Sequence, residues 1–310
     1  MNQRKYKHIF GPVPSRRLGR SLGVDLVPFK ACPFDCTYCQ LGRTTNKTAE
    51  RREYVPTQEV LDELAERFAS EPNCCDVVTL SGSGEPTLHS GLGRVIAGIK
   101  AVAKVPVVVL TNGALLSDPQ VRRELLRADI VAPDLDAGDE ETFQKINRPC
   151  GGVTLRAIVE GLKAFRREYR GQLCVEVFAV AGVNDSDEQM GRIAAILDEI
   201  RPDQIDLNTV ARPPAEATAR AVDPARLERL RQILGPKARI IAPRAGAGGT
   251  GAAGKDAIAD MVRRHPCTLE DIVTATGAPR AEVERLLAEL VNEGRLSEKR
   301  VNGGSFYSPP

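Results

Sequence analysis

The stretch Cys32-Pro-Phe-Asp-Cys36-Thr-Tyr38-Cys39 sets three cysteines in eight residues, separated first by three residues and then by two. Thiolates are the ligands that iron–sulfur clusters use, and this spacing allows one loop to wrap around a corner of a cubane. Three thiolates hold three irons, so the fourth iron stays open to another ligand. The stretch therefore predicts a [4Fe-4S] site on Cys32, Cys36 and Cys39.

Zinc is the main alternative for this triplet. Structural zinc takes four protein ligands, usually as paired C-x2-C units, and no further cysteine or histidine stands at a suitable spacing. The remaining cysteines are scattered and predict no disulfide framework: Cys74, Cys75, Cys150, Cys174 and Cys267. The pattern favours an iron–sulfur site over zinc.

Apolar segments and amphipathic segments alternate along most of the chain. Strands are predicted at residues 21–27, 76–81, 105–111, 129–134, 173–180 and 204–208, and helices at 57–68, 91–102, 118–126, 154–169, 187–200 and 224–234. Near-continuous apolar strands separated by helices indicate a parallel sheet with a covered outer face. The predicted fold is α/β, a partial (βα)6 barrel whose active site lies beyond the carboxyl ends of the strands. Residues 11–20 are predicted as a loop, because they are rich in turn formers.

A second, smaller domain is predicted at the end of the chain. The barrel is expected over residues 1–243, a Gly/Ala-rich linker over 244–254, and three helices followed by two strands over 255–310. This order is that of a winged helix-turn-helix. Its third helix carries Arg280 and Arg285 against four glutamates, which disfavours specific DNA binding. We expect a module that docks protein or substrate.

Basic charge gathers around the cysteines. Residues 1–52 contain eleven basic and three acidic residues, a net charge of +8, whereas the whole chain carries +2. A positive field attracts an anionic small molecule or RNA. Alternatively, these arginines form ion pairs with acids elsewhere in the fold.

The sequence predicts a cytoplasmic protein that does not enter membranes. The first eight residues lack the apolar core of a secretion signal. No apolar run reaches the ~18 residues that a membrane-spanning helix needs.

Polar residues follow the carboxyl ends of the predicted strands. They are Ser83-Gly84-Glu85-Pro86 after the second strand, Thr111 and Asn112 after the third, Asp136 after the fourth, and Arg212 after the sixth. Glycine lets a ligand approach the backbone closely. Thr111 and Asn112 suit a ribose or carboxylate, or form a plain capping turn. Glu176, inside the fifth strand, needs a partner, which is either a ligand or an arginine.

The cysteine stretch has an aromatic residue before its last cysteine, and Gly84-Glu85-Pro86 follows one βα unit later. In this combination, residues 10–210 resemble the radical S-adenosylmethionine (SAM) superfamily. The resemblance implies that the open iron chelates SAM, with Tyr38 near the adenine. It places the amino group of SAM at the turn of Ser83, Gly84, Glu85 and Pro86. Judged by their own chemistry, Thr111, Asn112, Asp136 and Glu176 are further candidate contacts to SAM.

The resemblance also implies the chemistry. A one-electron reductant such as flavodoxin or ferredoxin feeds the cluster, and SAM is cleaved to methionine and a 5′-deoxyadenosyl radical that abstracts hydrogen from a substrate. Two segments, Gly11-Pro-Val-Pro-Ser-Arg16-Arg17 and Ile146-Asn-Arg-Pro149, are similar in sequence to the branch of the superfamily that contains the wyosine-type tRNA base-forming enzymes. Those enzymes bind a second cluster through upstream cysteines. This sequence has no cysteine before Cys32, so a single cluster is expected.

Three functions are open on the sequence alone. The first is a radical SAM enzyme acting on an anionic small molecule or an RNA base, with Arg16, Arg17 and Arg212 as substrate contacts. The second is the same chemistry on a peptide or protein docked by the C-terminal domain. The third is an iron–sulfur sensor that binds DNA, which the acidic third helix disfavours.

Overall fold

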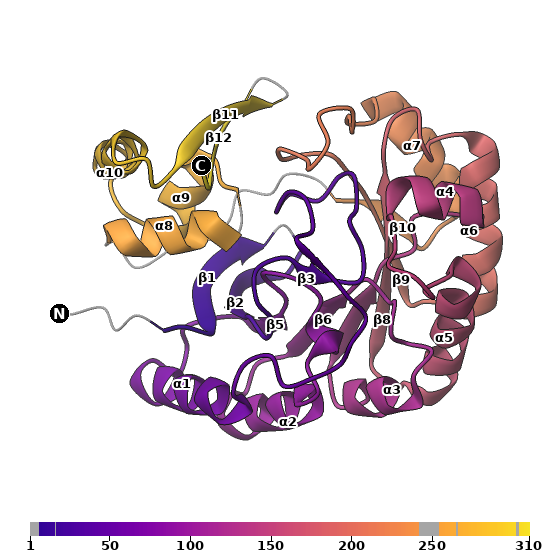
Figure 1. Cartoon of the computed structure of the whole chain (residues 1–310), viewed down its shortest axis with the longest axis horizontal. Coiled ribbons are helices and arrows are strands. Elements are labelled where there is room, and N and C mark those ends of the chain that lie inside the picture. The colour runs from indigo at the N-terminus through magenta and orange to yellow at the C-terminus, as the bar shows by residue number, and fades with distance from the viewer. Residues whose placement is uncertain (1–5, 16, 242–253, 265, 302–303) are drawn as a thin grey trace.

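One curved sheet with helices along its outer face dominates the computed structural model (Figure 1). The structure describes residues 6–15, 17–241, 254–264, 266–301 and 304–310. The strands stand in the order β1 (Ile9–Ser15), β2 (Gly19–Val24), β5 (Val77–Leu80), β6 (Val107–Thr111), β7 (Ile130–Pro133), β8 (Gln172–Ala179), β9 (Gln204–Thr209) and β10 (Ala238–Ile240). All of them run parallel except β1, which is antiparallel to β2.

Helices connect the parallel strands, as the sequence predicted for a partial barrel. They are α1 (Thr57–Ser70), α2 (Leu92–Val102), α3 (Pro119–Leu125), α4 (Glu140–Ile146), α5 (Leu155–Glu168), α6 (Asp187–Ile200) and α7 (Pro224–Leu234). Several begin at side-chain caps; Asp118 and Asp223 each accept a hydrogen bond from a backbone N–H in the first turn, with proline at the first helical position. None of the described helices is long and apolar enough to cross a lipid bilayer.

The edge strand β1 corrects the sequence prediction. Residues 11–20 were predicted as a loop, but residues up to Ser15 belong to β1, and Gly19 begins β2. The register of β1 against β2 shifts between Phe10 and Val13, which marks a bulge. An edge strand with a bulge tolerates prolines that a central strand would exclude, so the turn-rich composition was misleading.

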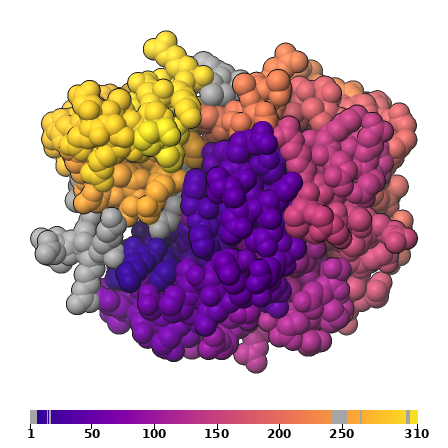
Figure 2. Space-filling view, in the orientation of Figure 1, coloured from indigo at the N-terminus to yellow at the C-terminus, as the bar shows by residue number. Residues whose placement is uncertain are grey.

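The C-terminal segment folds as the sequence predicted, with α8 (Lys255–Arg264), α9 (Leu269–Thr276), α10 (Arg280–Asn292), β11 (Ser297–Val301) and β12 (Gly304–Ser308). It has its own apolar core, and Val13 of β1 packs against that core. The domain therefore lies beside β1, as Figures 1 and 2 show. The predicted linker lies outside the described residues apart from Gly254, its last.

Candidate active site

The three cysteines lie in the connection between β2 and α1, which a small ladder of β3 (Ala31–Cys32) and β4 (Asn46–Lys47) braces. All three are free thiols of intermediate exposure. The Thr37 N–H donates to the Ile146 carbonyl at 2.9 Å, so the end of α4 fixes the middle of the loop. The loop thus stands beyond the carboxyl end of β2, where a barrel active site belongs.

Each cysteine sulfur accepts a hydrogen bond from one side chain. Lys30 Nζ lies 3.1 Å from the Cys39 Sγ. Asn112 Nδ2 lies 3.4 Å from the Cys32 Sγ, and Asn147 Nδ2 lies 3.5 Å from the Cys36 Sγ. The donors come from the cysteine loop itself, from the end of β6 and from the residue after α4. Such bonds stabilise the negative charge of thiolates.

Two of the three thiols, those of Cys32 and Cys36, are poor acids. Burial raises the pKa of Cys32 to about 12, and the charge of Glu85 adds to the effect. Burial, followed by the neighbouring Cys32 and Cys39 sulfurs, raises the pKa of Cys36 well above its usual value. A positively charged metal centre would release these protons and relieve the repulsion. The ligand set therefore fits a metal group that contacts all three sulfurs.

The three cysteines provide the thiolate donors that iron–sulfur clusters use. Within the described ranges, no three His, Cys, Asp or Glu side chains converge on one metal position. A structural zinc ion needs its ligands around one centre, whereas each thiolate of a cubane holds a different iron.

The turn after β5 packs directly on the cysteine loop. The Lys30 N–H donates to the Ser83 carbonyl at 2.6 Å, and the Glu85 N–H donates to the Ala31 carbonyl at 3.0 Å. A Cβ on Gly84 would lie 2.0 Å from the Ala31 carbonyl oxygen, so only glycine fits there. Pro86 begins the short helix η1 (Pro86–Leu88) and is buried. The predicted pairing of this turn with the cysteines is present.

The Glu85 carboxylate holds strand ends together. It is 3% exposed and accepts hydrogen bonds from Thr111 Oγ1 at 2.6 Å, the Asn112 N–H at 2.7 Å and the Thr87 N–H at 3.0 Å. Burial raises the pKa of Glu85, and these hydrogen bonds oppose the increase. Glu85 thereby fixes Asn112, whose amide reaches Cys32. The Ser83 hydroxyl is likewise engaged, because it donates to Asp25.

Asp136 organises the other side of the cysteine loop. It accepts hydrogen bonds from the Tyr38 hydroxyl, from Asn147 Nδ2 at 2.7 Å and from the Phe178 N–H at 2.9 Å. The Tyr38 ring stacks on Phe178, with 3.9 Å between ring centroids. Burial raises the pKa of Asp136 to about 6 against the pull of those donors. One carboxylate thus positions both the predicted adenine neighbour and the amide that reaches Cys36.

Two residues of this site, Asn147 and Asp134, are not among the contacts predicted from the sequence. Asn147 stands in the segment Ile146–Pro149 that carries the family resemblance, and Asp134 follows β7, two residues before the predicted contact Asp136. Burial, followed by the charges of Asp136, Glu176 and Glu85, raises the pKa of Asp134 well above its usual value. A carboxyl group in the Asp-Leu-Asp pair before α4 was the available signal.

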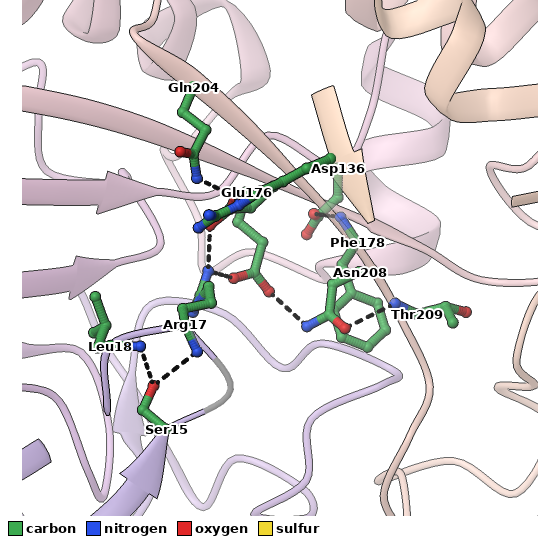
Figure 3. A network of polar contacts seen from close by, with 11 residues as sticks. Ser15, Arg17, Leu18, Asp136, Glu176, Phe178, Gln204, Asn208 and Thr209 are labelled. Atoms are coloured by element: carbon green, nitrogen blue, oxygen red, sulfur yellow. Dashed lines mark hydrogen bonds and ion pairs between the residues drawn. The ribbon is translucent and has the colours of Figure 1, made fainter. Parts of the chain in front are cut away.

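Figure 3 shows that Arg17 points into the barrel toward Glu176 of β8. The Arg17 guanidinium donates to the Glu176 carboxylate and lies 3.3 Å from the Asp206 Oδ2, and Asn208 Nδ2 donates to the Glu176 Oε1 at 3.1 Å. Of the two partners that the sequence left open for Glu176, an arginine is the one observed. Arg16, the other predicted contact in this segment, lies outside the described residues.

A cavity of about 330 Å³ opens inside the barrel beside these groups. Its walls include Phe10, Tyr38, Cys39, Thr79, Phe178 and Arg212. Cys39 therefore borders this cavity.

Arg212 links the cavity to the C-terminal domain. Its side chain is 14% exposed; its Nη1 lies 3.3 Å from the Gln40 Oε1, and its Nη2 lies 3.9 Å from the Asp271 Oδ2 on α9. The C-terminal domain thus reaches the wall of the cavity.

Much of the basic charge of residues 1–52 is paired within the fold. Ion pairs join Lys7 to Glu59, Arg17 to Glu176 and Asp206, Arg20 to Asp76, Arg43 to Asp35 and Glu216, and Arg51 to Glu124. The acids come mostly from later parts of the chain. These pairs weaken the positive field that the count of +8 suggested, and they agree with the alternative reading of that charge.

Comparison with protein families identifies the class. The model of the radical SAM superfamily matches residues 26–194, more than half of the chain, and the model of the IclR helix-turn-helix domain matches residues 256–299. The chain therefore belongs to the radical SAM superfamily of enzymes. Members of this superfamily use a [4Fe-4S] cluster and SAM, as the sequence resemblance implied.

Individual relatives agree with this assignment. A UPF0026 protein of Methanocaldococcus jannaschii is 33% identical, over 96% of this chain and 94% of that protein. A Brachyspira hyodysenteriae protein named GTPase Obg is 36% identical over 98% of this chain, but the chain spans only 45% of its length. A solved radical SAM methyltransferase from Sphaerobacter thermophilus shares the fold, with a TM-score of 0.53 and 18% identity over 71% of this chain and 65% of that chain. The similarity to wyosine-type enzymes stays a prediction.

Proposed function

We propose that Cys32, Cys36 and Cys39 hold the [4Fe-4S] cluster and that the enzyme acts on a small anionic molecule in the adjacent cavity. The observation that carries the proposal is the position of Cys39, which both accepts a hydrogen bond from Lys30 and borders the 330 Å³ cavity. When bound, the cluster supplies the electron that cleaves SAM and starts hydrogen abstraction from the substrate. A flavodoxin- or ferredoxin-type reductant would supply that electron.

The protein's own residues arrange this site. The turn of Ser83, Gly84, Glu85 and Pro86 would present its backbone to the amino group of SAM. Gly84 allows this turn to pack on the cysteine loop, because a Cβ there would lie 2.0 Å from the Ala31 carbonyl oxygen. Thr111, Asn112 and Asp136 lie at the ends of neighbouring strands, and Glu176 lies within β8. The Glu85 and Asp136 carboxylates already accept several protein donors, so we assign to them the positioning of Asn112, Asn147 and Tyr38.

Arg212 is the substrate contact that we favour among the predicted arginines. It lines the cavity and is largely buried, and burial lowers its pKa, so its charge lies where water screens it poorly. An anionic substrate group would compete with Gln40 and Asp271 for its guanidinium. Arg17 already donates to Glu176 and Asp206, and we assign it to holding that pair.

A small molecule agrees with the charge distribution better than RNA does. RNA affinity depends on many cations that are available to phosphates, and several arginines near the cysteines form ion pairs with acids of the same chain. The RNA base and the docked peptide remain the competing substrate classes. A cavity of 330 Å³ falls within the range typical of small-molecule sites.

Anaerobic reconstitution tests the proposal. Protein loaded with iron and sulfide should show the ~400 nm absorption of an iron–sulfur cluster, and with SAM and dithionite it should release 5′-deoxyadenosine. Cys36→Ala should lose both signals, whereas Cys150→Ala, which changes a half-buried cysteine outside the triplet, should keep both. Loss of the cluster in both variants, or in neither, would contradict the ligand assignment.

A further inference from the structure

The three donors that face the cysteine sulfurs are chemically unequal. Asn112 and Asn147 offer neutral amides at 3.4 Å and 3.5 Å. Lys30 offers an ammonium group at 3.1 Å from the Cys39 Sγ, the shortest of the three distances. A full positive charge therefore lies against one sulfur, and dipoles lie against the other two.

The placement of Lys30 is energetically costly. The residue is 3% exposed. Its backbone has a φ of 60°, in the left-handed region that residues other than Gly, Asn and Asp rarely adopt. Burying an ammonium group is unfavourable unless an opposite charge compensates it. Among the residues that the structure describes, no carboxylate forms an ion pair with Lys30. The negative charge of a thiolate-bound cluster would supply that compensation.

The backbone of Lys30 is fixed at both of its polar groups. Its N–H donates to the Ser83 carbonyl at 2.6 Å, and its carbonyl accepts from the Asn46 N–H at 3.1 Å. Lys30 thus bridges the turn after β5 and β4. The side chain starts from this fixed point and is buried, with its Nζ 3.1 Å from the Cys39 Sγ.

We propose that Lys30 raises the reduction potential of the cluster by stabilising its reduced form electrostatically. This inference rests on the proposed function, because it assumes that Cys39 is a ligand. One electron from a low-potential one-electron donor adds to the cluster, no bond forms or breaks, and the donor is oxidised by one electron. The reduced cluster carries one more negative charge, so a cation buried beside Cys39 favours it.

Redox titration of the reconstituted protein without SAM tests this role. We expect Lys30→Met to make one-electron reduction about tenfold less favourable, a shift of about 59 mV to more negative potential for a one-electron couple. Lys47→Met is the matched control. Lys47 lies in β4 and pairs with Cys32 of β3, the strand that directly follows Lys30, and its Nζ lies 3.4 Å from the Arg148 carbonyl oxygen. The control should keep the wild-type potential.

Two further variants separate charge from hydrogen bonding and from folding. Lys30→Arg keeps the charge and should stay near the wild-type potential. Lys30→Gln keeps a neutral donor, so its reduction potential should become more negative, as in Lys30→Met. If the methionine variant does not take up the cluster, Lys30→Gln tests the inference in its place. Iron and sulfide content and the EPR signal of the reduced cluster report loading independently of activity.

The outcomes distinguish this inference from the proposed function. If wild-type protein holds no cluster, the proposed function fails. If it holds one and cleaves SAM, but loaded Lys30→Met and Lys30→Gln keep its potential, the inference alone is wrong. The inference would also be wrong if the Lys30 variants kept the wild-type potential but bound SAM more weakly. That result would indicate that the ammonium group binds the carboxylate of SAM instead.

Discussion

Arg17 shows how a single residue can be fixed by its surroundings. Its side chain is 17% exposed and lies between Glu176, which is 14% exposed, and Asp206, which is 3% exposed. Asp206 also pairs with Arg239 at 2.8 Å, whereas the second hydrogen-bond donor to Glu176 within the described part of the chain is the neutral Asn208. Glu176 therefore depends on Arg17 for charge compensation.

Replacing Arg17 should expose that dependence. We expect Arg17→Met to lower the free energy of unfolding by about 3–5 kcal/mol, the cost of leaving a buried ion pair half broken. The double variant Arg17→Met/Glu176→Gln should regain most of the loss, because glutamine needs no counter-charge and can still accept from Asn208. Urea unfolding of the four proteins in the cycle measures the coupling. Equal losses in the single and double variants would contradict a charge-based role.

The sequence could name the cysteines but not the groups that face them. Cys32, Cys36 and Cys39 are recognisable because their spacing is local. Asn147 reaches Cys36 across 111 positions of sequence, and Asn112 reaches Cys32 across 80. Such contacts depend on how strand ends converge, which periodicity does not encode. The same limit left Glu176 with two possible partners until the position of Arg17 was seen.

At the scale of elements, the six parallel strands of the predicted barrel were foreseeable because their apolar runs are nearly continuous. Helix α4 was missed, since its seven residues are too short to show a clear helical period. It nonetheless carries Asn147 at its C-cap, so an inconspicuous helix places one of the three sulfur donors.

The N-cap of α4 yields a pH-dependent prediction. The Asp139 carboxylate accepts from the Thr142 N–H at 2.8 Å, and this bond, followed by Gln189, lowers its pKa from 3.8 to about 2. A lowered pKa contributes stability that is present above pH 3.8 and is lost as the pH falls toward 2. Asp139→Ala should therefore cost about 1 kcal/mol at pH 7.

The cost of Asp139→Ala should shrink as the pH falls below about 4, because the carboxylate of the unfolded chain takes up a proton there while that of the folded protein stays ionised until about pH 2. Chemical denaturation at pH 7, 5 and 3.5 would measure it. Asp139→Asn, which retains a capping oxygen, serves as the control and should lose less. A penalty for the alanine variant that does not change with pH would argue against the ionised cap.

At the scale of the whole molecule, the C-terminal domain has the fold of a DNA-binding winged helix-turn-helix, but it lacks an excess of positive charge on α10. On α10, Arg280 pairs with Glu270 and Glu284, and Arg285 pairs with Glu289. These two arginines of α10 are thus bound to acids of the same domain and are less available to phosphates.

We expect the protein to bind DNA only weakly and without sequence preference, far from the ~10⁻⁸ M or tighter typical of specific readers. Fluorescence anisotropy with random duplexes at physiological salt would measure this. Glu270→Gln/Glu284→Gln, which frees Arg280, should increase the affinity and its dependence on salt. Tight, sequence-selective binding by the wild type would contradict the expectation.

Strand β1 takes part in two packing environments. Phe10 and Ser15 line the barrel cavity, while Val13 both lines it and packs on the core of the C-terminal domain. Seven residues therefore tie the shape of the substrate space to the presence of its neighbour. For protein engineering, residues 9–15 and 255–310 form one exchangeable unit: a chimaera that imports a different tail must import a matching edge strand, or it will change what the barrel accepts.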